Sequence, residues 1–147
     1  MSQKMLIDAS HDEETRVVVL ESKKVEDFDF VSGIFDLTRE AVNKGYLIFI
    51  ITNQAGIGKG IFSKSDFYKL HNQIKEKLQN KNIFFDDVNY CPYHPKAKLK
   101  KYRKKTELRK PGNLMIRQIK KKWHIKDRKS FMIGDKISDK ICAKKSK

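Results

Sequence analysis

The sequence predicts an α/β fold, an open parallel sheet with helices on both faces. From residue 33 onward, apolar segments of strand length alternate with segments whose apolar residues recur at helical spacing. The segment Tyr46–Thr52 is a continuous apolar strand, as is typical of strands buried on both faces of a parallel sheet. Strands separated by helices of this length predict βαβ units. A chain of 147 residues is long enough for one such domain.

The first thirty residues have a different pattern, which predicts β structure. Lys4–Ile7 is a short apolar run, and Arg16–Leu20 and Val25–Phe30 are placed as the two strands of a hairpin. The central strand of a parallel sheet is buried on both faces, and Lys4–Ile7 is short for that place. By length, Arg16–Leu20 fits it better.

Six elements are expected beyond residue 30. In chain order they are a helix that ends at Gly45, the strand Tyr46–Thr52, a helix that begins at Ser63, the strand Asp87–Cys91, a helix over Leu114–Trp123 and a buried strand Ser130–Ile133. Ser63 followed three residues later by Asp66 is the pattern of a capping box. Pro111 is suited to the first turn of the helix that follows it.

The composition is that of a globular protein. Hydrophobic residues make up 39% of the chain and charged residues 35%. The longest apolar run is far too short to span a membrane, and residues 1–6 contain no apolar stretch of signal-peptide length. Two cysteines, Cys91 and Cys142, fit a reducing compartment. We therefore expect a cytoplasmic protein.

The formal net charge of +15 has two explanations that the sequence leaves open. Nucleic-acid binding is one, because seven of the ten residues of Lys96–Lys105 are basic. However, lysines are spread over nearly the whole chain, and no helix-turn-helix, RNA-recognition or zinc-finger pattern occurs. A basic site that faces a phosphate ester explains the sign of the charge equally well, so nucleic acid is the less favoured partner.

Two polar clusters follow directly on predicted strands, where ligands of open parallel sheets bind. Thr52-Asn53-Gln54 is followed by three glycines and Lys59, which predicts a phosphate cradle of backbone N–H groups and a threonine hydroxyl. Asp135 and Asp139 follow the last strand and suit Mg²⁺, which prefers oxygen ligands. A glycine-rich turn and a surface turn are the alternatives for the two clusters taken singly.

The motifs, in their order, resemble one family. They are Thr52–Phe62 (Thr-Asn-Gln-x-Gly-Ile-x-Lys-Gly-x-Phe), Cys91–Pro95 (Cys-Pro-x-His-Pro), Arg109–Pro111 (Arg-Lys-Pro) and Gly134–Asp139 (Gly-Asp-Lys-x-x-Asp). Together they resemble the haloacid-dehalogenase-like (HAD-like) phosphatases, in particular the branch of D-glycero-D-manno-heptose 1,7-bisphosphate phosphatase and histidinol-phosphatase. The resemblance covers residues 25–147. It implies a Rossmann-like fold, hydrolysis of a sugar bisphosphate through a phospho-aspartyl intermediate, and Mg²⁺ as cofactor.

The resemblance also implies roles for single residues. Thr52 would hold the transferred phosphoryl group, and Lys110 would stabilise its charge. Asp135 would be the Mg²⁺ ligand, with support from Asp139. Substrate contacts are implied for Asn53, Gln54, Lys59 and Arg109. Asp8, which follows the apolar run Lys4–Ile7, is the candidate for the nucleophile and for a further Mg²⁺ ligand.

The start of the chain departs from the family pattern. Members open with a buried strand that ends in Asp-x-Asp-Gly, where one aspartate attacks phosphorus and the other is the general acid and base. No such motif occurs here, and Ser10 stands two residues after Asp8. A serine hydroxyl is a poor proton donor and acceptor, so we expect no turnover from the chain as it stands.

Two further departures concern zinc and the end of the chain. Some members bind a structural zinc, but here Tyr93, Thr106 and Leu108 replace ligands that would accompany Cys91. One thiolate cannot hold a tetrahedral zinc, so none is expected, and His94 is assigned to ordinary loop packing. Relatives continue beyond the position of Lys147, so the chain resembles a form truncated at its C-terminus.

Residues 1–30 resemble the N-terminus of ribonuclease E/G instead. The sequence therefore predicts an N-terminal β segment at residues 1–30 and an incomplete phosphatase domain at residues 31–147, and either a chimeric gene or a diverged first motif explains the junction. Two rival functions stay open: a polynucleotide 3′-phosphatase of the same superfamily, and a non-catalytic RNA-associated fragment. The favoured hypothesis is a monomer that acts on a small sugar phosphate, away from membranes.

Overall fold

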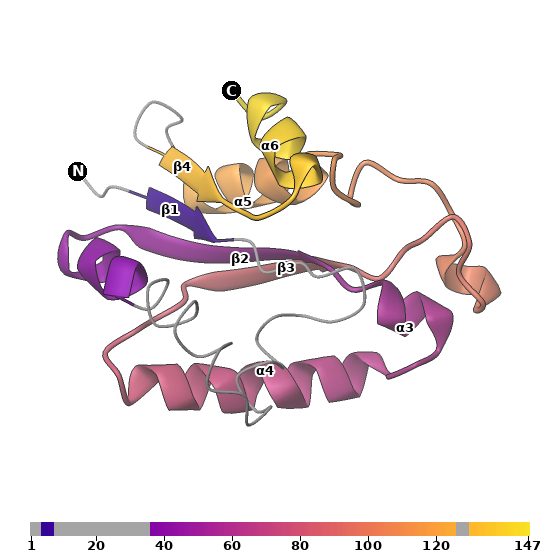
Figure 1. The fold of residues 1–147 in the computed structure, drawn as a ribbon, viewed down its shortest axis with the longest axis horizontal. Coiled ribbons are helices and arrows are strands. Elements are labelled where there is room, and N and C mark those ends of the chain that lie inside the picture. Colours follow the sequence, from indigo (N-terminus) through magenta and orange to yellow (C-terminus); the bar gives the residue numbers. More distant parts are fainter. Residues whose placement is uncertain (1–3, 8–35, 126–129) are drawn as a thin grey trace.

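The computed structural model describes residues 4–7, 36–125 and 130–147 (Figure 1). The elements in chain order are β1 (Lys4–Ile7), a helix at residues 36–43, β2 (Leu47–Asn53), α3 (Ala55–Lys59), α4 (Lys64–Gln79), β3 (Asp87–Cys91), a 3₁₀ turn (Lys100–Tyr102), α5 (Leu114–Trp123), β4 (Ser130–Ile133) and α6 (Ile137–Lys144). The predicted hairpin, Arg16–Leu20 and Val25–Phe30, lies outside the described residues. None of the helices in the described ranges combines the length and the apolar character needed to cross a bilayer.

The four strands form one parallel sheet in the order β3-β2-β1-β4. β1 pairs with β2 on one side and with β4 on the other, so that Ile7 is level with Ile50 and Ile133. The expectation that Lys4–Ile7 is too short for a central place was therefore wrong. Four residues suffice here because both neighbouring strands satisfy the backbone hydrogen bonds of β1.

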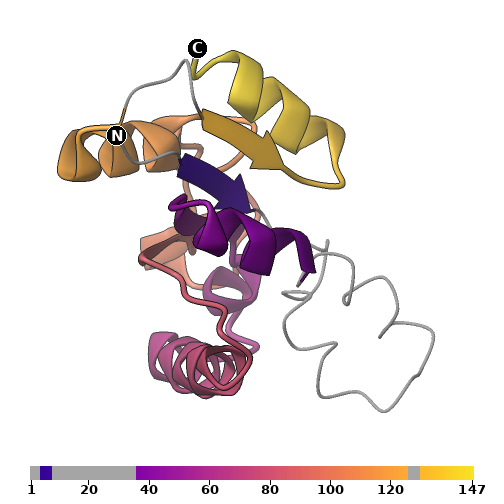
Figure 2. The ribbon, with the colours of Figure 1, turned by 90° about the vertical axis from the view of Figure 1, so that its left-hand side faces the viewer.

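Helices cover both faces of the sheet, which confirms the predicted architecture. In Figure 1, α5 and α6 lie on one side of the strands and α4 on the other; Figure 2 shows the same layers after a quarter turn. The side chains of β2 alternate between these layers. Phe49 and Ile51 pack with Met115 and Ile119 of α5, whereas Ile48 packs with Ala41 on the opposite face.

The helix and strand ends follow the local signals of the sequence. Ser63 caps α4 as predicted, because its hydroxyl accepts the Asp66 N–H at 3.1 Å and the Asp66 carboxylate accepts the Ser63 N–H at 2.9 Å. Gly45 follows the helix at residues 36–43 with a φ of 76°, a conformation that favours glycine. All five interior residues of β2 are buried, as its apolar sequence predicts.

Two details of the prediction were wrong. β4 was expected to be buried, but Phe131 is 44% exposed, because β4 is the outer strand of the described sheet and its faces are only partly covered. Pro111 was placed in the first turn of a helix, but α5 begins at Leu114. Pro111 instead belongs to a tight turn in which the Gly112 N–H donates to the Arg109 carbonyl at 2.8 Å.

Candidate active site

The carboxyl ends of the strands bring the predicted site segments to one edge of the sheet. Thr52 and Asn53 end β2, Asp135 follows β4 by two residues, and α3 lies beyond the same edge (Figure 1). β1 ends at Ile7, level with Ile50 and Ile133. Asp8, the next residue in the sequence, lies outside the described residues, so its place at this edge stays a prediction.

Buried polar side chains gather at this edge. The described part of the chain buries five polar or charged residues, each 1–3% exposed: Thr38, Thr52, Gln54, Lys110 and Asp139. The last four lie at the carboxyl ends of the strands. Burial of polar groups costs free energy unless each is paired, so four of them in one place mark a site built for polar chemistry.

Lys110 and Asp139 form an ion pair inside the protein. The Lys110 Nζ stands 3.0 Å from the Asp139 Oδ1, and both side chains are at most 3% exposed. The Lys110 Nζ also donates to the Ile51 carbonyl at 3.4 Å. Burial lowers the pKa of Lys110, while the carboxylate of Asp139 opposes that shift. An ammonium in such surroundings acts strongly on a nearby anion, because little water screens it.

Asp139 also caps the first turn of α6. Its Oδ2 accepts the Lys136 N–H at 3.0 Å, and a side chain at Gly134 would place a Cβ only 2.6 Å from the Asp139 Cβ. The sequence suggested Asp139 as a supporting Mg²⁺ ligand and did not reveal its pairing with Lys110. The sequence does contain one sign of its capping role. Asp139 stands three residues after Lys136, and an acidic residue at that position of a helix accepts the N–H of the residue before the helix.

Thr52 and Gln54 form a second buried pair. The Gln54 Nε2 donates to the Thr52 Oγ1 at 3.0 Å, and the Gln54 N–H donates to the Cys91 carbonyl at 2.8 Å, which extends the pairing of β2 with β3. A hydroxyl has one proton to donate and two lone pairs. One lone pair of the Thr52 hydroxyl oxygen therefore already accepts a hydrogen bond from Gln54.

Lys59 and Arg109, two of the four predicted substrate contacts, are less buried than the four polar residues at this edge, and both lie near His94. Lys59 is exposed at the end of α3, and the Arg109 Nη1 donates to the Tyr93 carbonyl at 3.5 Å. Burial, followed by the charges of Arg109 and Lys59, lowers the pKa of His94. The His94 Nδ1 accepts the Lys96 N–H at 3.0 Å, which is the loop packing expected of it.

Gly56 and Gly58 lie in α3, and Gly60 is its C-cap. The N–H groups of Ile57, Gly60 and Ile61 donate to carbonyls of this turn, and the expected phosphate cradle stays a prediction. Gly56 and Gly58 are buried, and a Cβ on Gly58 would lie 2.6 Å from the Pro92 carbonyl oxygen. These glycines are needed for close packing, a tertiary requirement that the glycine pattern alone does not reveal.

Gly58→Ala is therefore expected to destabilise the protein by about 1–3 kcal/mol, because the methyl group meets a backbone atom that cannot turn aside. Urea unfolding measures the change. Gly45→Ala is a useful contrast, since no atom lies within 4 Å of its Cβ position. Its only destabilisation comes from the backbone strain of an alanine at a φ of 76°. Equal destabilisation by both variants would contradict the packing role of Gly58.

The described residues fit Mg²⁺ better than zinc. Mg²⁺ is usually held by one or two carboxylates, with waters and phosphate oxygens as its other ligands. Asp135 is exposed at the strand edge, and its charge acts on Lys110. Cys91 is fully buried, burial raises the pKa of its thiol, and its Sγ is directed at the Tyr93 carbonyl. Within the described ranges no three His, Cys, Asp or Glu residues are grouped as metal ligands.

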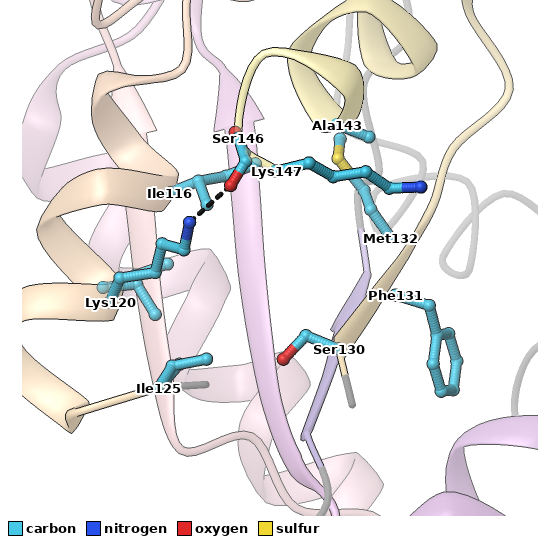
Figure 3. Close-up of a pocket in the computed structure, with 10 residues that line it drawn as sticks. Ile116, Lys120, Ile125, Ser130, Phe131, Met132, Ala143, Ser146 and Lys147 are labelled. Atoms are coloured by element: carbon cyan, nitrogen blue, oxygen red, sulfur yellow. Dashed lines mark hydrogen bonds between the residues drawn. The ribbon is translucent and has the colours of Figure 1, made fainter. Parts of the chain in front are cut away.

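A cavity of about 80 Å³ lies elsewhere, between α5, the start of β4 and the end of α6 (Figure 3). Its lining is mainly apolar, with Ile116, Ile119 and Met132 among its residues, and Lys120 donates to the Ser146 carbonyl at its rim. Phe131 points to the other side of β4 (Figure 3). Because the cavity adjoins the N-terminal end of β4, it is separate from the site at the carboxyl ends.

Comparison with known proteins agrees with this fold. The family model described as Polynucleotide kinase 3 phosphatase matches residues 8–147. The D-glycero-beta-D-manno-heptose-1,7-bisphosphate 7-phosphatase of Rhodopseudomonas palustris is 40% identical over 115 residues, which are 78% of this chain and 64% of that protein. The Escherichia coli protein of the same name is 31% identical over 116 residues, 79% of this chain and 61% of that protein. The chain thus spans less than two thirds of the length of these relatives.

Two solved structures share the fold. A HAD-like phosphatase from Mesorhizobium loti has a TM-score of 0.82 and 22% identity, over 99% of this chain and 68% of that one. D,D-heptose 1.7-bisphosphate phosphatase from B. bronchiseptica, complexed with magnesium and phosphate, has a TM-score of 0.74 and 18% identity, over 99% of this chain and 76% of that one.

The ribonuclease E/G resemblance of residues 1–30 finds no support in these matches, and the division of the chain at residue 30 stays a prediction. The family model begins at residue 8 and runs to the last residue, so it includes every segment of the candidate site that the structure describes beyond β1. The chain belongs to the polynucleotide kinase 3 phosphatase family, and its fold is that of the HAD-like phosphatases.

Proposed function

We propose that this chain is the phosphate-handling part of a Mg²⁺-dependent phosphatase that acts on D-glycero-D-manno-heptose 1,7-bisphosphate. The observation that carries the proposal is the burial of Thr52, Lys110 and Asp139 at the carboxyl edge of a parallel sheet, with Asp135 exposed beside them. Donors held in place away from water stabilise charge that develops on a transferred group, at no cost of reorganisation. The identity of 31–40% to heptose bisphosphate phosphatases supports the choice of substrate.

In the proposed reaction an Asp8 carboxylate oxygen attacks phosphorus, the phosphorus–oxygen bond to the sugar breaks, and the sugar leaves as an alcohol with a proton from water. A second water then hydrolyses the phospho-aspartate and releases inorganic phosphate. Thr52 donates its hydroxyl proton to a phosphoryl oxygen, and the Lys110 ammonium balances the charge of the group. Asp135 and Asp8 would hold Mg²⁺ through their carboxylates, and Asp139 would support the site. The metal, when bound, neutralises phosphate charge and orients the group.

The second phosphate of the substrate is proposed to meet the basic residues around His94. Lys59 and Arg109 both lie near enough to His94 for their charges to lower its pKa, so the surroundings of His94 are positive enough to attract an anion. The proposed place of action is the cytoplasm, where the unpaired thiols of Cys91 and Cys142 are stable.

A polynucleotide 3′-phosphate is the second candidate substrate. Between Asp87 and Glu107 the chain has no acidic residue, and Lys96–Lys105 carries seven basic ones. The lysines of this segment are exposed, so they form a positive surface next to the loop that holds His94. The name of the family model points the same way.

Titration calorimetry with inorganic phosphate tests the proposal without requiring turnover. We expect Mg²⁺-dependent phosphate binding that weakens at least about tenfold in Asp135→Asn, the loss typical of one metal-site group. Asp36→Asn is the control, because Asp36 is an exposed carboxylate of a surface ion pair. Competition between the heptose bisphosphate and a 3′-phosphorylated oligonucleotide identifies the substrate. Absence of phosphate binding with and without Mg²⁺ would overturn the proposal.

A further inference from the structure

The side chain of Asn53 is bound to the main chain of Lys110 at both ends of its amide. The Asn53 Oδ1 accepts the Lys110 N–H at 3.0 Å, and the Asn53 Nδ2 donates to the Lys110 carbonyl at 3.3 Å. One asparagine thus supplies to Lys110 the pair of hydrogen bonds that a neighbouring strand supplies to a residue in a sheet. The two residues are 57 positions apart in the sequence, so this contact joins separate parts of the fold.

Lys110 needs such support because it lies outside helix and strand. The chain from residue 103 to residue 113 has no regular element, and α5 begins only at Leu114. The turn at Arg109–Gly112 is closed by one backbone hydrogen bond. The Cys142 thiol donates to the Gly112 carbonyl at 3.2 Å, and burial raises the pKa of that thiol to about 11, so that it keeps its proton.

The end of β2 holds Lys110 at two points. Asn53 fixes its main chain, and the Ile51 carbonyl accepts from its Nζ at 3.4 Å. Thr52 lies between these two residues in the same strand. The distance between the ammonium and the threonine hydroxyl is therefore set by three consecutive residues of β2, together with the Asp139 carboxylate, rather than by the long loop that carries Lys110.

From this geometry we propose that Asn53 is a positioning residue that holds Lys110 in register with Thr52, and not a substrate contact. The inference rests on the proposed function, in which Thr52 and Lys110 act on one phosphoryl group. A group misplaced by about 1 Å loses much of its effect on a transferred group, which is why a main-chain clamp on a catalytic lysine matters.

Two substitutions of Asn53 separate positioning from substrate contact. Asn53→Ala removes both hydrogen bonds, whereas Asn53→Asp keeps the acceptor for the Lys110 N–H. If Asn53 positions Lys110, we expect inorganic phosphate to bind about tenfold more weakly to Asn53→Ala, with much of that loss restored in Asn53→Asp. If Asn53 contacts the substrate, Asn53→Asp is the weaker binder, because a negative charge then faces the phosphate.

Asn89→Ala is the matched control. The Asn89 Nδ2 donates to the Met115 carbonyl at 3.2 Å, so this variant also loses a hydrogen bond from a strand asparagine to a main-chain group, in this case one of α5. We expect it to bind phosphate as the unmodified chain does. Hydrogen exchange of the Lys110 N–H, followed by NMR without ligand, should accelerate about tenfold in Asn53→Ala and stay slow in Asn53→Asp and Asn89→Ala.

Phosphate binding to Asn53→Asp that is no tighter than to Asn53→Ala overturns the inference, as does unchanged exchange of the Lys110 N–H in Asn53→Ala. If Asn53→Ala does not fold, the isosteric Asn53→Asp decides: affinity within about tenfold of the unmodified chain supports positioning, and a larger loss refutes it. Failure of the proposed function has a different signature, since the unmodified chain then binds no phosphate while the exchange of the Lys110 N–H still reports the clamp.

Discussion

Ser10→Asp is expected to raise Mg²⁺-dependent phosphate release from heptose 1,7-bisphosphate by at least about 10²-fold, the contribution of a general acid and base. The substitution places a second carboxylate two residues after Asp8, as in the Asp-x-Asp-Gly motif that the family pattern has and this chain lacks. A single change is proposed because β1 already occupies an interior place between β2 and β4. Release of inorganic phosphate over time measures the result.

Ser65→Asp is the control for added charge, since Ser65 is exposed in the first turn of α4. It should leave phosphate release at background. Asp8→Asn in the Ser10→Asp chain should remove the gained activity, because the nucleophile is lost. Turnover by the unmodified chain that Asp8→Asn abolishes would show that Asp8 acts without a second aspartate, and the expectation for Ser10 would then be wrong.

Lys110→Met is expected to lower the free energy of unfolding by about 3–5 kcal/mol, because it leaves the buried carboxylate of Asp139 without a partner. Phosphate binding should disappear with it. Urea unfolding measures the change in stability, and titration calorimetry with inorganic phosphate measures the loss of binding.

Lys122→Met provides the matched control for Lys110→Met. Lys122 is also paired with an aspartate, since its Nζ stands 2.7 Å from the Asp87 Oδ2, but its side chain is 65% exposed. Surface pairs of this kind contribute about 0–1 kcal/mol. Asp139→Asn, added to Lys110→Met, should recover part of the lost stability. Similar losses from the two lysine substitutions would contradict the account of a buried ion pair.

The elements with strong local signals could be predicted from the sequence. β2 is apolar along its length, and α4 begins at a serine whose capping partner is three residues away. The rule that ligands bind at the carboxyl ends of parallel strands singled out Thr52 and Asp135. These signals depend on neighbouring residues or on a general property of the fold, so they can be read without knowing tertiary contacts.

The sequence could not show contacts between residues that are far apart in the chain. The place of β1 depends on strands some forty and more than a hundred residues away in the sequence, and its four residues carry no sign of it. The need for glycine at position 58 comes from the Pro92 carbonyl. Asp139 has the residue type of a metal ligand, and only the fold places the Lys110 ammonium against it.

Asn53, the last residue of β2, and Gln54, which follows it, hold the two ends of the loop between β3 and Lys110. The chain leaves at Cys91, whose carbonyl accepts from the Gln54 N–H, and it returns at Lys110, which is bound to Asn53. The two ends of this loop are therefore held by residues outside it. Exposed residues within 95–105 can be exchanged to admit a different ester, in the way that antibodies change loops on a constant framework, whereas Ala97 and Tyr102 must be kept, because both are buried and pack with Ile57 and Phe67.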